Sequence, residues 1–352
     1  MWSPEREMAY IVVVEDNKDV AEVVCDALRS EGHRCFVIRS KAGAERLSRR
    51  QQDRGRLVGP HPFRRLSQVQ ARRSGKGRRA VAGRALRPLR RGLLMVGAAL
   101  LDPYEPDPVT LENESGDSVF FLTCEHAGRV FPRRLGTLGL PEAETLRHIA
   151  WDIGIGSVGQ ELSRLLNAAV ILQTYSRLVI DCNRDPNVPS SIPEISESTE
   201  IPGNRGLDEA DRAARADAIF RPYHNAIRAA LDRRAAANRA TALVALHSFT
   251  PVFKGVSRPW HVAVLFNRDR RLAHELAELL RAEGDLMVGE NEPYQVSDQT
   301  DYTVPVHGER RGLPHVEIEI RQDLIIDPAG QRQWAERLAR LLPAAYAEFL
   351  RR

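Results

Sequence analysis

The stretch Val119-Phe-Phe-Leu-Thr-Cys-Glu-His-Ala-Gly128 decides the fold class of this chain. An apolar run of strand length leads directly into polar residues, which is typical of a buried parallel strand that ends at a ligand site. Five later apolar runs also suit buried strands, over residues 169–172, 178–180, 241–246, 261–266 and 314–320. We therefore predict a sheet whose strands are largely buried on both faces.

Amphipathic segments alternate with these strands. Helices are predicted over residues 157–167, 207–236, 270–283 and 331–350, the first with Val158, Leu162, Leu165 and Leu166 on one face. Strands that alternate with helices indicate an α/β domain, with a mixed, mostly parallel sheet and helices on both faces.

Polar residues end three of the predicted strands. Glu125 and His126 follow the first, His247 follows the fourth, and Glu317 and Glu319 lie in the sixth. Because ligands gather at the carboxyl ends of strands in such sheets, we expect these side chains to meet at one edge. Two histidines and a carboxylate from separate strand ends suit a catalytic zinc with three protein ligands and one open position.

The charge is distributed unevenly along the 352 residues, whose net charge is +4. Residues 51–94 hold 12 arginines and Lys76 against one acid, Asp53, so this stretch carries +12 and the remainder −8. The remainder is therefore acidic, and no nucleic-acid partner is expected for it. The stretch itself has three interpretations: a disordered basic linker, a nucleic-acid-binding arm, or coding sequence translated out of frame. We favour the third, with Met95 as the original start, which resequencing or an N-terminal mass measurement tests.

Residues 9–48 form a strand, helix and strand pattern. Tyr10 to Val14 and Cys35 to Ile38 are the strands, and residues 19–30 the helix. The segment resembles the start of a response-regulator receiver domain, whose acidic pair after the first strand, here Glu15 and Asp16, holds Mg²⁺. The resemblance then stops, and Asp53 lies in an Arg-rich context rather than at a strand end. A response regulator with a non-enzymatic output is therefore the weaker alternative for the whole chain.

The four cysteines, Cys25, Cys35, Cys124 and Cys182, show no CxxC spacing, and the N-terminus lacks the pattern of a secretory signal. These features favour a reducing, cytoplasmic location. No apolar run approaches the roughly 18 residues that span a bilayer, so no membrane insertion is expected. The oligomeric state is not predicted.

Seven blocks between about residues 117 and 324 carry a second resemblance. They are Cys124-Glu-His-Ala-Gly128, His148-Ile-Ala-Trp-Asp-Ile-Gly154, Tyr175-Ser-Arg-Leu-Val-Ile-Asp-Cys-Asn-Arg184, His247-Ser-Phe-Thr-Pro251, Gly289-Glu-Asn-Glu-Pro-Tyr294, Tyr302-Thr-Val-Pro-Val-His-Gly-Glu-Arg-Arg311 and residues 314–324. In this order they resemble the N-formylglutamate amidohydrolase family, whose fold is similar to that of zinc carboxypeptidases. We expect three parts: a receiver-like fragment over 1–50, a linker over 51–100 and an amidohydrolase domain over 101–352.

The resemblance implies roles for individual residues. His247 corresponds to a histidine ligand of zinc, and Glu319 to the catalytic glutamate, with Glu317 as rival base. A structural ion pair with Arg321 is the alternative role for either glutamate. His126 is the other histidine ligand, and Asp152 is preferred over Glu125 as the third. The competing role for Asp152 is an N-cap of the helix expected near residue 155.

The implied reaction is zinc-dependent hydrolysis of the amide bond of an N-formyl or N-acyl amino acid, such as N-formyl-L-glutamate. The carboxylates of this small-molecule substrate would be bound by Asn183 and by candidates among Arg184, Arg177, Arg310 and Arg311, because guanidinium groups bind carboxylates with two hydrogen bonds. Only one of the consecutive Arg310 and Arg311 is expected to point inward. The polar stretches 289–294 and 297–302 are a candidate lid. A zinc amidase that acts on a peptide or cell-wall amide is the alternative.

Overall fold

The computed structural model describes residues 10–14, 34–38 and 99–352, and the chain divides into two units, residues 1–91 and 92–352. In the first unit, strand β1 (Tyr10–Val14) pairs in parallel with β2 (Arg34–Ile38), which coincides with the two strands predicted there. The predicted helix 19–30, the acidic pair Glu15 and Asp16, and the Arg-rich stretch 51–94 lie outside the described residues.

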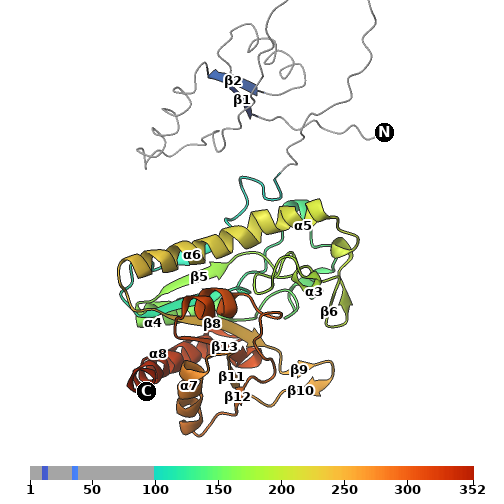
Figure 1. Ribbon diagram of the computed structural model, residues 1–352. Coiled ribbons are helices and arrows are strands. Elements are labelled where there is room, and N and C mark those ends of the chain that lie inside the picture. The colour runs from blue at the N-terminus through green and yellow to red at the C-terminus, as the bar shows by residue number, and fades with distance from the viewer. Residues whose placement is uncertain (1–9, 15–33, 39–98) are drawn as a thin grey trace, which may run out of the picture. The chain divides into compact units, whose positions relative to one another are not determined.

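The second unit is built on a seven-stranded sheet in the order β12-β11-β13-β8-β4-β5-β3 (Figure 1). The strands are β3 (Val109–Glu112), β4 (Phe120–Cys124), β5 (Ala169–Gln173), β8 (Ala242–Phe249), β11 (Val262–Leu265), β12 (Val288–Glu290) and β13 (His315–Arg321). The four central strands β13, β8, β4 and β5 are parallel. On one side, β11 and β12 run antiparallel to them, and on the other β3 does. The prediction of a mixed, mostly parallel sheet is confirmed.

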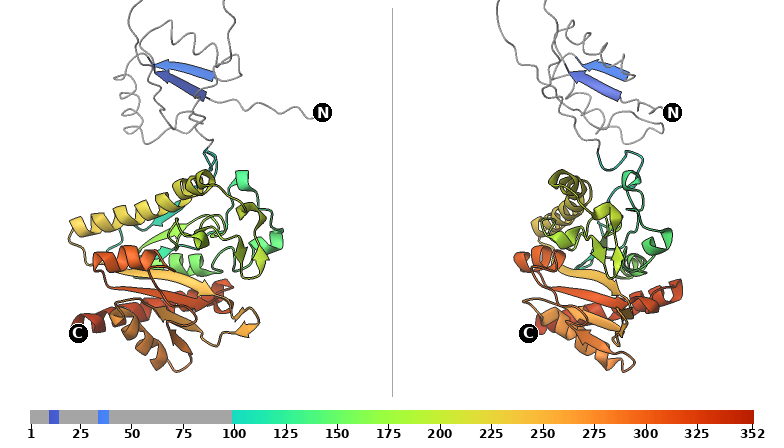
Figure 2. Two further views of the ribbon diagram at one scale, coloured as in Figure 1. Left: turned by 45° about the vertical axis from the view of Figure 1, so that its right-hand side comes forward. Right: turned by 90° about the vertical axis from the view of Figure 1, so that its right-hand side faces the viewer.

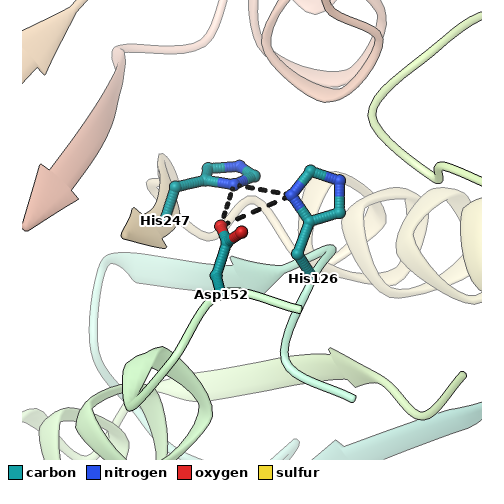
Figure 3. A group of neighbouring side chains, drawn as sticks. All are labelled: His126, Asp152 and His247. Carbon is teal, nitrogen blue, oxygen red and sulfur yellow. Dashed lines mark hydrogen bonds and ion pairs between the residues drawn. The ribbon is translucent and has the colours of Figure 1, made fainter. Parts of the chain in front are cut away.

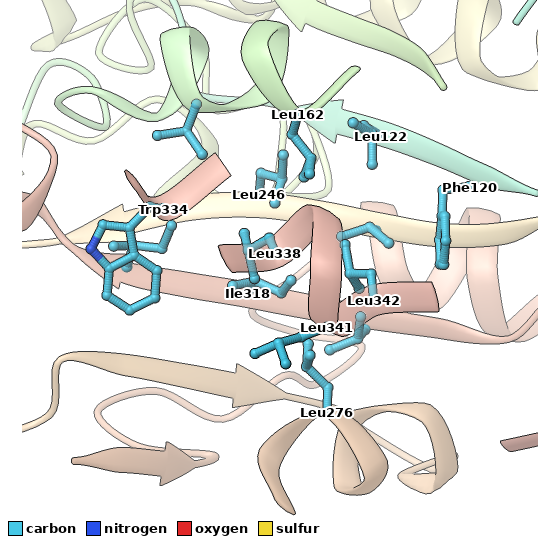
Figure 4. Packing of buried hydrophobic residues seen from close by; sticks show 14 of the residues in the cluster. Phe120, Leu122, Leu162, Leu246, Leu276, Ile318, Trp334, Leu338, Leu341 and Leu342 are labelled. Atoms are coloured by element: carbon cyan, nitrogen blue, oxygen red, sulfur yellow. The ribbon is translucent and has the colours of Figure 1, made fainter. Parts of the chain in front are cut away.

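Helices cover both faces of this sheet, as Figures 1 and 2 show. One face packs against α4 (Ile155–Leu166), α7 (Arg271–Ala282) and α8 (Pro328–Arg351), and alternate strand residues fill this core together with helix residues such as Leu162, Leu276 and Leu338 (Figure 4). The other face packs against α6 (Arg221–Ala236) and the loops before it. Because side chains alternate between the two faces, the odd-numbered residues of β4, β8 and β13 point to this second face. Phe121 and Leu243 belong to its core, which leaves His247, Glu317 and Glu319 for a site.

A glycine allows helix α4 to pack directly against strand β4. A Cβ atom added to Gly159 would lie 2.7 Å from Sγ of the buried Cys124, closer than real Cβ contacts come. The helix begins after Gly154, whose φ of 84° is in the left-handed region that favours glycine. This close approach brings the loop before α4, which contains Asp152, up to the carboxyl end of β4.

The predicted strand over residues 178–180 is wrong. Leu178, Val179 and Ile180 are buried in the second core, but their backbone bonds go to turns and loops, such as Val179 N–H to the Ser176 carbonyl. The edge strands β3 and β12 were not predicted. The single helix predicted over 207–236 is divided into α5 (Glu209–Arg215), a π-helical turn over 216–220 and α6. Pro222 lacks an N–H for the regular helical bond, which accounts for the wider turn just before it.

Two short hairpins lie outside the main sheet: β6 (Ile195–Ser196) with β7 (Thr199–Glu200), and β9 (Val252–Phe253) with β10 (Val256–Ser257). The N–H of Lys254 donates to a carboxylate oxygen of Glu197, at 3.4 Å, and so joins the two hairpins. Within residues 99–352, no helix has both the length and the apolar character needed to cross a membrane.

Candidate active site

The three polar strand ends predicted to meet do so. In the parallel ladder between β13 and β8, Glu319 is the direct neighbour of His247. On the other side of β8, Thr123 of β4 is the neighbour of Ala245, so Glu125 and His126 follow at the same edge. Both carboxylates and both histidines are buried.

Three side chains from separate segments point their donor atoms at one another (Figure 3). The Nδ1 atoms of His126 and His247 lie 3.2 Å apart, and Oδ2 of Asp152 lies 3.4 Å from the first and 3.0 Å from the second. Ligand atoms about 2.0–2.1 Å from a tetrahedral zinc lie about 3.3 Å from one another. The three distances therefore match one face of a zinc coordination tetrahedron.

The Nε2 atoms of both histidines face carboxylates, which bears on where the ring protons lie. His126 Nε2 lies 2.7 Å from Oδ1 of Asp181, and His247 Nε2 lies 3.1 Å from Oε2 of Glu125. When the rings are neutral, these carboxylates favour a proton on Nε2, which leaves the lone pair of each ring on Nδ1. Two lone pairs and a carboxylate oxygen then face a common point with no proton between them. A bound cation removes this repulsion, so the donor set fits a metal, and the carboxylates behind the histidines are the usual support of such ligands.

Asp152 and Asp181 are held by a shared arginine. Arg177 contacts Oδ1 of Asp152 at 3.2 Å and Oδ2 of Asp181 at 2.6 Å. The backbone N–H of Ser248 also donates to Oδ2 of Asp152. The N-cap role considered for Asp152 is wrong, because the N-cap of α4 is Gly154 and no side chain caps that helix.

The electrostatics of these carboxylates keep them ionised. Burial alone would raise the pKa of Asp152, but His126 and His247, when they are protonated, together with Arg177 outweigh it and hold the pKa well below its usual range. Arg177 and His126 likewise lower the pKa of the buried Asp181. Burial opposes ionisation of Glu125 too, yet the adjacent His247 lowers its pKa to about 2. The pocket for a cation is therefore negatively charged at neutral pH.

Glu125, the alternative third ligand, lies at the opposite edge of the His247 ring. It faces Nε2, whereas Asp152 and His126 face Nδ1. A metal bound at Nδ1 is therefore shielded from Glu125 by the imidazole ring. This position suits a carboxylate that orients the histidine.

Glu317 and Glu319 point to the same face of β13 and line the cavity beside the two histidines. Burial raises the pKa of Glu319 to about 8, and raises that of Glu317 well above its usual range. A carboxyl group whose pKa lies close to the working pH is suited to take up and release a proton. Neither pairs with Arg321, whose guanidinium instead contacts Asp323 and the backbone carbonyls of residues 258–260.

The cavity has a volume of about 290 Å³ and contains three of the predicted substrate-binding residues, Arg177, Asn183 and Arg184. Arg184 lies 3.6 Å from Oδ1 of Asp301. Asn183 accepts hydrogen bonds from the backbone of residues 302 and 303 and so fixes the loop that closes the cavity. The other two candidates do not line it: Arg310 is exposed, and Arg311 pairs with Asp232 of α6.

Sequence reasoning missed three residues of the site. Asp181 supports His126, and Tyr294 and Asp301 line the cavity. Asp181 directly follows the apolar residues 178–180. Its position after a buried run is the sequence feature that could have identified it as a site residue. Tyr294 and Asp301 lie in the polar stretches 289–294 and 297–302, which were singled out only as a candidate lid and not for these two side chains.

Comparisons with known proteins cover the part of the chain that contains this site. Residues 118–326 match the family model described as N-formylglutamate amidohydrolase. A gene product of Agrobacterium tumefaciens, Atu2144, is 39% identical with a TM-score of 0.68, and the match covers 71% of this chain and 98% of that one. The N-formylglutamate amidohydrolase of Ralstonia eutropha JMP134 is 20% identical with a TM-score of 0.53, over 69% of this chain and 98% of that one, and it supports the fold alone. Among curated proteins no match was found.

The matched region covers well over half of the 352 residues and includes every side chain of the site described above. It also includes all four parallel strands of the sheet that positions them. The chain belongs to the N-formylglutamate amidohydrolase family, a family of enzymes that hydrolyse amide bonds.

Proposed function

We propose that this chain is a zinc-dependent amidohydrolase that cleaves the amide bond of an N-formyl or N-acyl amino acid such as N-formyl-L-glutamate. One observation carries the proposal: His126, His247 and Asp152 direct two ring nitrogens and a carboxylate oxygen at one point, with separations of 3.0–3.4 Å. The buried Asp181 and Glu125 hold the two rings in that orientation.

Zinc bound there would lower the pKa of a water molecule to about 7 and polarise the substrate carbonyl. Glu319 is proposed to accept the proton of the attacking water and to pass it to the leaving amine. Glu319 lies directly beside His247 on the neighbouring strand, which supports this role for it. Glu317 lies two residues earlier in β13, opposite Ala245, and so further from the carboxyl edge of the sheet. Burial raises the pKa of Glu319, which makes it a stronger base once it is ionised.

The substrate is proposed to place a carboxylate against Arg184, with Asn183 holding the adjoining loop. Arg177 lines the same cavity, but Asp152 and Asp181 already neutralise it, so its proposed role is to position these carboxylates. A cavity of about 290 Å³ is at the small end of the range for ligand sites, which favours a single acyl amino acid over a peptide or cell-wall fragment.

A substrate panel tests the proposal. The purified chain with one equivalent of zinc is assayed on N-formyl and N-acetyl derivatives of glutamate, aspartate, glutamine and methionine, and on a dipeptide, with and without a chelator. We expect turnover of at least one acyl amino acid, loss of turnover with chelator and recovery with zinc. Turnover of none of them by zinc-loaded protein, or turnover that survives complete metal removal, would contradict it.

No observation among the described residues favours the signalling alternative. The acidic pair Glu15 and Asp16 on which it depends lies outside them, while the described His126, Asp152 and His247 could together hold a metal ion.

A further inference from the structure

Arg258 follows the β9–β10 hairpin, and its side chain is buried although it carries a charge. Only 8% of the residue is exposed. The guanidinium lies between three aromatic rings, 4.6 Å from the centre of Phe253, 4.7 Å from Tyr294 and 5.9 Å from Phe249. These rings hold the group in place and provide cation–π attraction.

Across residues 99–352, no carboxylate pairs with Arg258. Its Nη1 donates a hydrogen bond to the hydroxyl of Tyr294, at 2.8 Å. A buried cation without a counter-charge is costly, and buried arginines are normally paired. Its other nitrogens are not among the buried polar atoms that are sealed from solvent without a partner, so they keep some contact with solvent.

The two arginines that line the cavity differ from Arg258 in this respect. Arg177 is paired with Asp152 and Asp181, and Arg184 lies near Asp301. Arg258 is linked to the same cavity through Tyr294, which is one of its lining residues. It therefore places a positive charge within hydrogen-bond distance of a lining residue, and within residues 99–352 no carboxylate pairs with it.

The hydrogen bond between Arg258 and Tyr294 also leaves a donor free. The hydroxyl oxygen accepts from the guanidinium, so its own proton remains available. Burial and the nearby Glu319 raise the pKa of Tyr294, which keeps the hydroxyl protonated at neutral pH. An anion next to Tyr294 would meet this O–H and a free N–H of Arg258 together.

We propose that Arg258 and Tyr294 bind the side-chain carboxylate of the amino-acid part of the substrate, and so make the enzyme selective for acidic acyl amino acids. This rests on the proposed hydrolysis of an acyl amino acid at the same site. Arg184 remains the partner of the α-carboxylate. Tyr294 belongs to one of the seven sequence blocks that resemble the family, whereas Arg258 lies outside all of them.

The test compares N-formyl-L-glutamate with N-formyl-L-glutamine, which has nearly the same shape without the charge. For the wild type we expect kcat/KM to favour glutamate. In Arg258→Met, which keeps most of the stem and loses the charge, the preference should fall by about 10- to 100-fold, the value of a charge-assisted hydrogen bond. The loss should be confined to the glutamate substrate. Arg340→Met, a matched change at an exposed arginine that pairs with Glu283, should leave the ratio unchanged.

A merely structural role for Arg258 predicts another result. If the side chain only ties the hairpin to Tyr294, Arg258→Met lowers the rate on both substrates equally and leaves the ratio intact, which would overturn the proposal. Should Arg258→Met not fold, as judged by circular dichroism, Tyr294→Phe carries the same test. It must then lower the glutamate preference, and an unchanged ratio would overturn the proposal.

Calorimetry separates this inference from the proposed reaction. Zinc-loaded protein is titrated with L-glutamate and with L-glutamine. We expect tighter binding of L-glutamate by the wild type and loss of that preference in Arg258→Met, even if no acyl amino acid is hydrolysed. Equal binding of the two amino acids by the wild type would refute the carboxylate site regardless of catalysis.

Discussion

The side chains that face the metal point are oriented by other residues that contact them. His126 and His247 reach the metal point from different strand ends, and each is oriented by a carboxylate at its other nitrogen, Asp181 and Glu125. Arg177 in turn joins Asp181 to Asp152. The geometry of the three donors therefore depends on at least three residues that do not touch the metal point themselves.

Replacement of Asp181 by Asn tests this dependence. The amide oxygen still accepts the hydrogen bond of His126, but the negative charge that strengthens the ligand is lost. We expect zinc affinity, measured by competition with a chromophoric chelator, to weaken by about 10- to 100-fold. Asp269→Asn, at a partly exposed aspartate paired with Arg271, serves as the matched control and should bind zinc as the wild type does. Equal affinity of the Asp181 variant and the wild type would show that the carboxylate does not support the ligand.

The two glutamates of β13 are distinguished by parallel variants. Glu319→Gln keeps the size of the side chain and removes its ability to take a proton, so we expect kcat to fall by about 10²- to 10⁴-fold with zinc affinity retained. Glu317→Gln should reduce kcat much less. The reverse order of the two effects would assign the base to Glu317.

At the scale of elements, the sequence predicted the central strands and the helices that cover them, because long runs with a clear period can be recognised one at a time. The carboxyl-edge rule then brought His126, His247 and Glu319 together without any knowledge of distance. Residues 178–180 show its limit: a short apolar run is buried whether it forms a strand or a turn. Arg310 and Arg311 show a second limit, since the direction of a side chain in a turn depends on tertiary contacts.

The close contact between Gly159 of α4 and Cys124 of β4 can be tested by mutation. An alanine at Gly159 would press its Cβ against Sγ of Cys124, 2.7 Å away, so Gly159→Ala should destabilise the protein by about 1–3 kcal/mol despite its better helix propensity. Cys124→Ala removes the sulfur that it meets. In urea unfolding, the double variant should lose less free energy than the sum of the single variants. Strict additivity would mean that the two residues do not contact each other.

A pair of stacked histidines connects α6 to the π-helical turn over residues 304–308. His307 Nε2 lies 3.0 Å from Nδ1 of His224, and His224 Nε2 lies 2.7 Å from the carbonyl of Cys182. Burial lowers the pKa of His224 to about 4, and burial together with His224 lowers that of His307 to about 3. Both rings are therefore neutral in the folded protein at pH 7.

This pair predicts a loss of stability in mild acid. Below an unfolded-state pKa of about 6.5, the unfolded chain binds protons that the folded chain does not, so stability is full above that pH and falls towards pH 4. In His307→Gln one such group is absent, and the free energy of unfolding should fall less steeply from pH 6.5 to 5, by up to about 1.4 kcal/mol per pH unit. Parallel curves for variant and wild type would contradict the assignment.

At the scale of the whole molecule, the matched family region begins at residue 118, but the fold of the second unit includes earlier residues. Leu100 and Leu101 pack against the second core, the Tyr175 hydroxyl donates to the carbonyl of Pro106, and β3 pairs with β5. The division predicted from the sequence, with the catalytic part over residues 101–352, remains a proposal that truncation can test.

Two truncations make that test. A chain of residues 95–352 keeps all of these contacts, so we expect its Tm and its kcat/KM to equal those of the full chain. A chain of residues 113–352 loses β3 and should show a Tm lower by about 5 °C or more. Loss of activity in the chain of residues 95–352 would show that the first 94 residues contribute to the enzyme.

The central claim is that zinc is bound by His126, His247 and Asp152, and X-ray absorption at the zinc edge tests it most directly. We expect one zinc per chain, with only nitrogen and oxygen neighbours at about 2.0–2.1 Å, two of them imidazoles, and loss of this signal in His247→Ala. A sulfur neighbour at about 2.3 Å, or a zinc spectrum that His247→Ala leaves unchanged, would contradict the account.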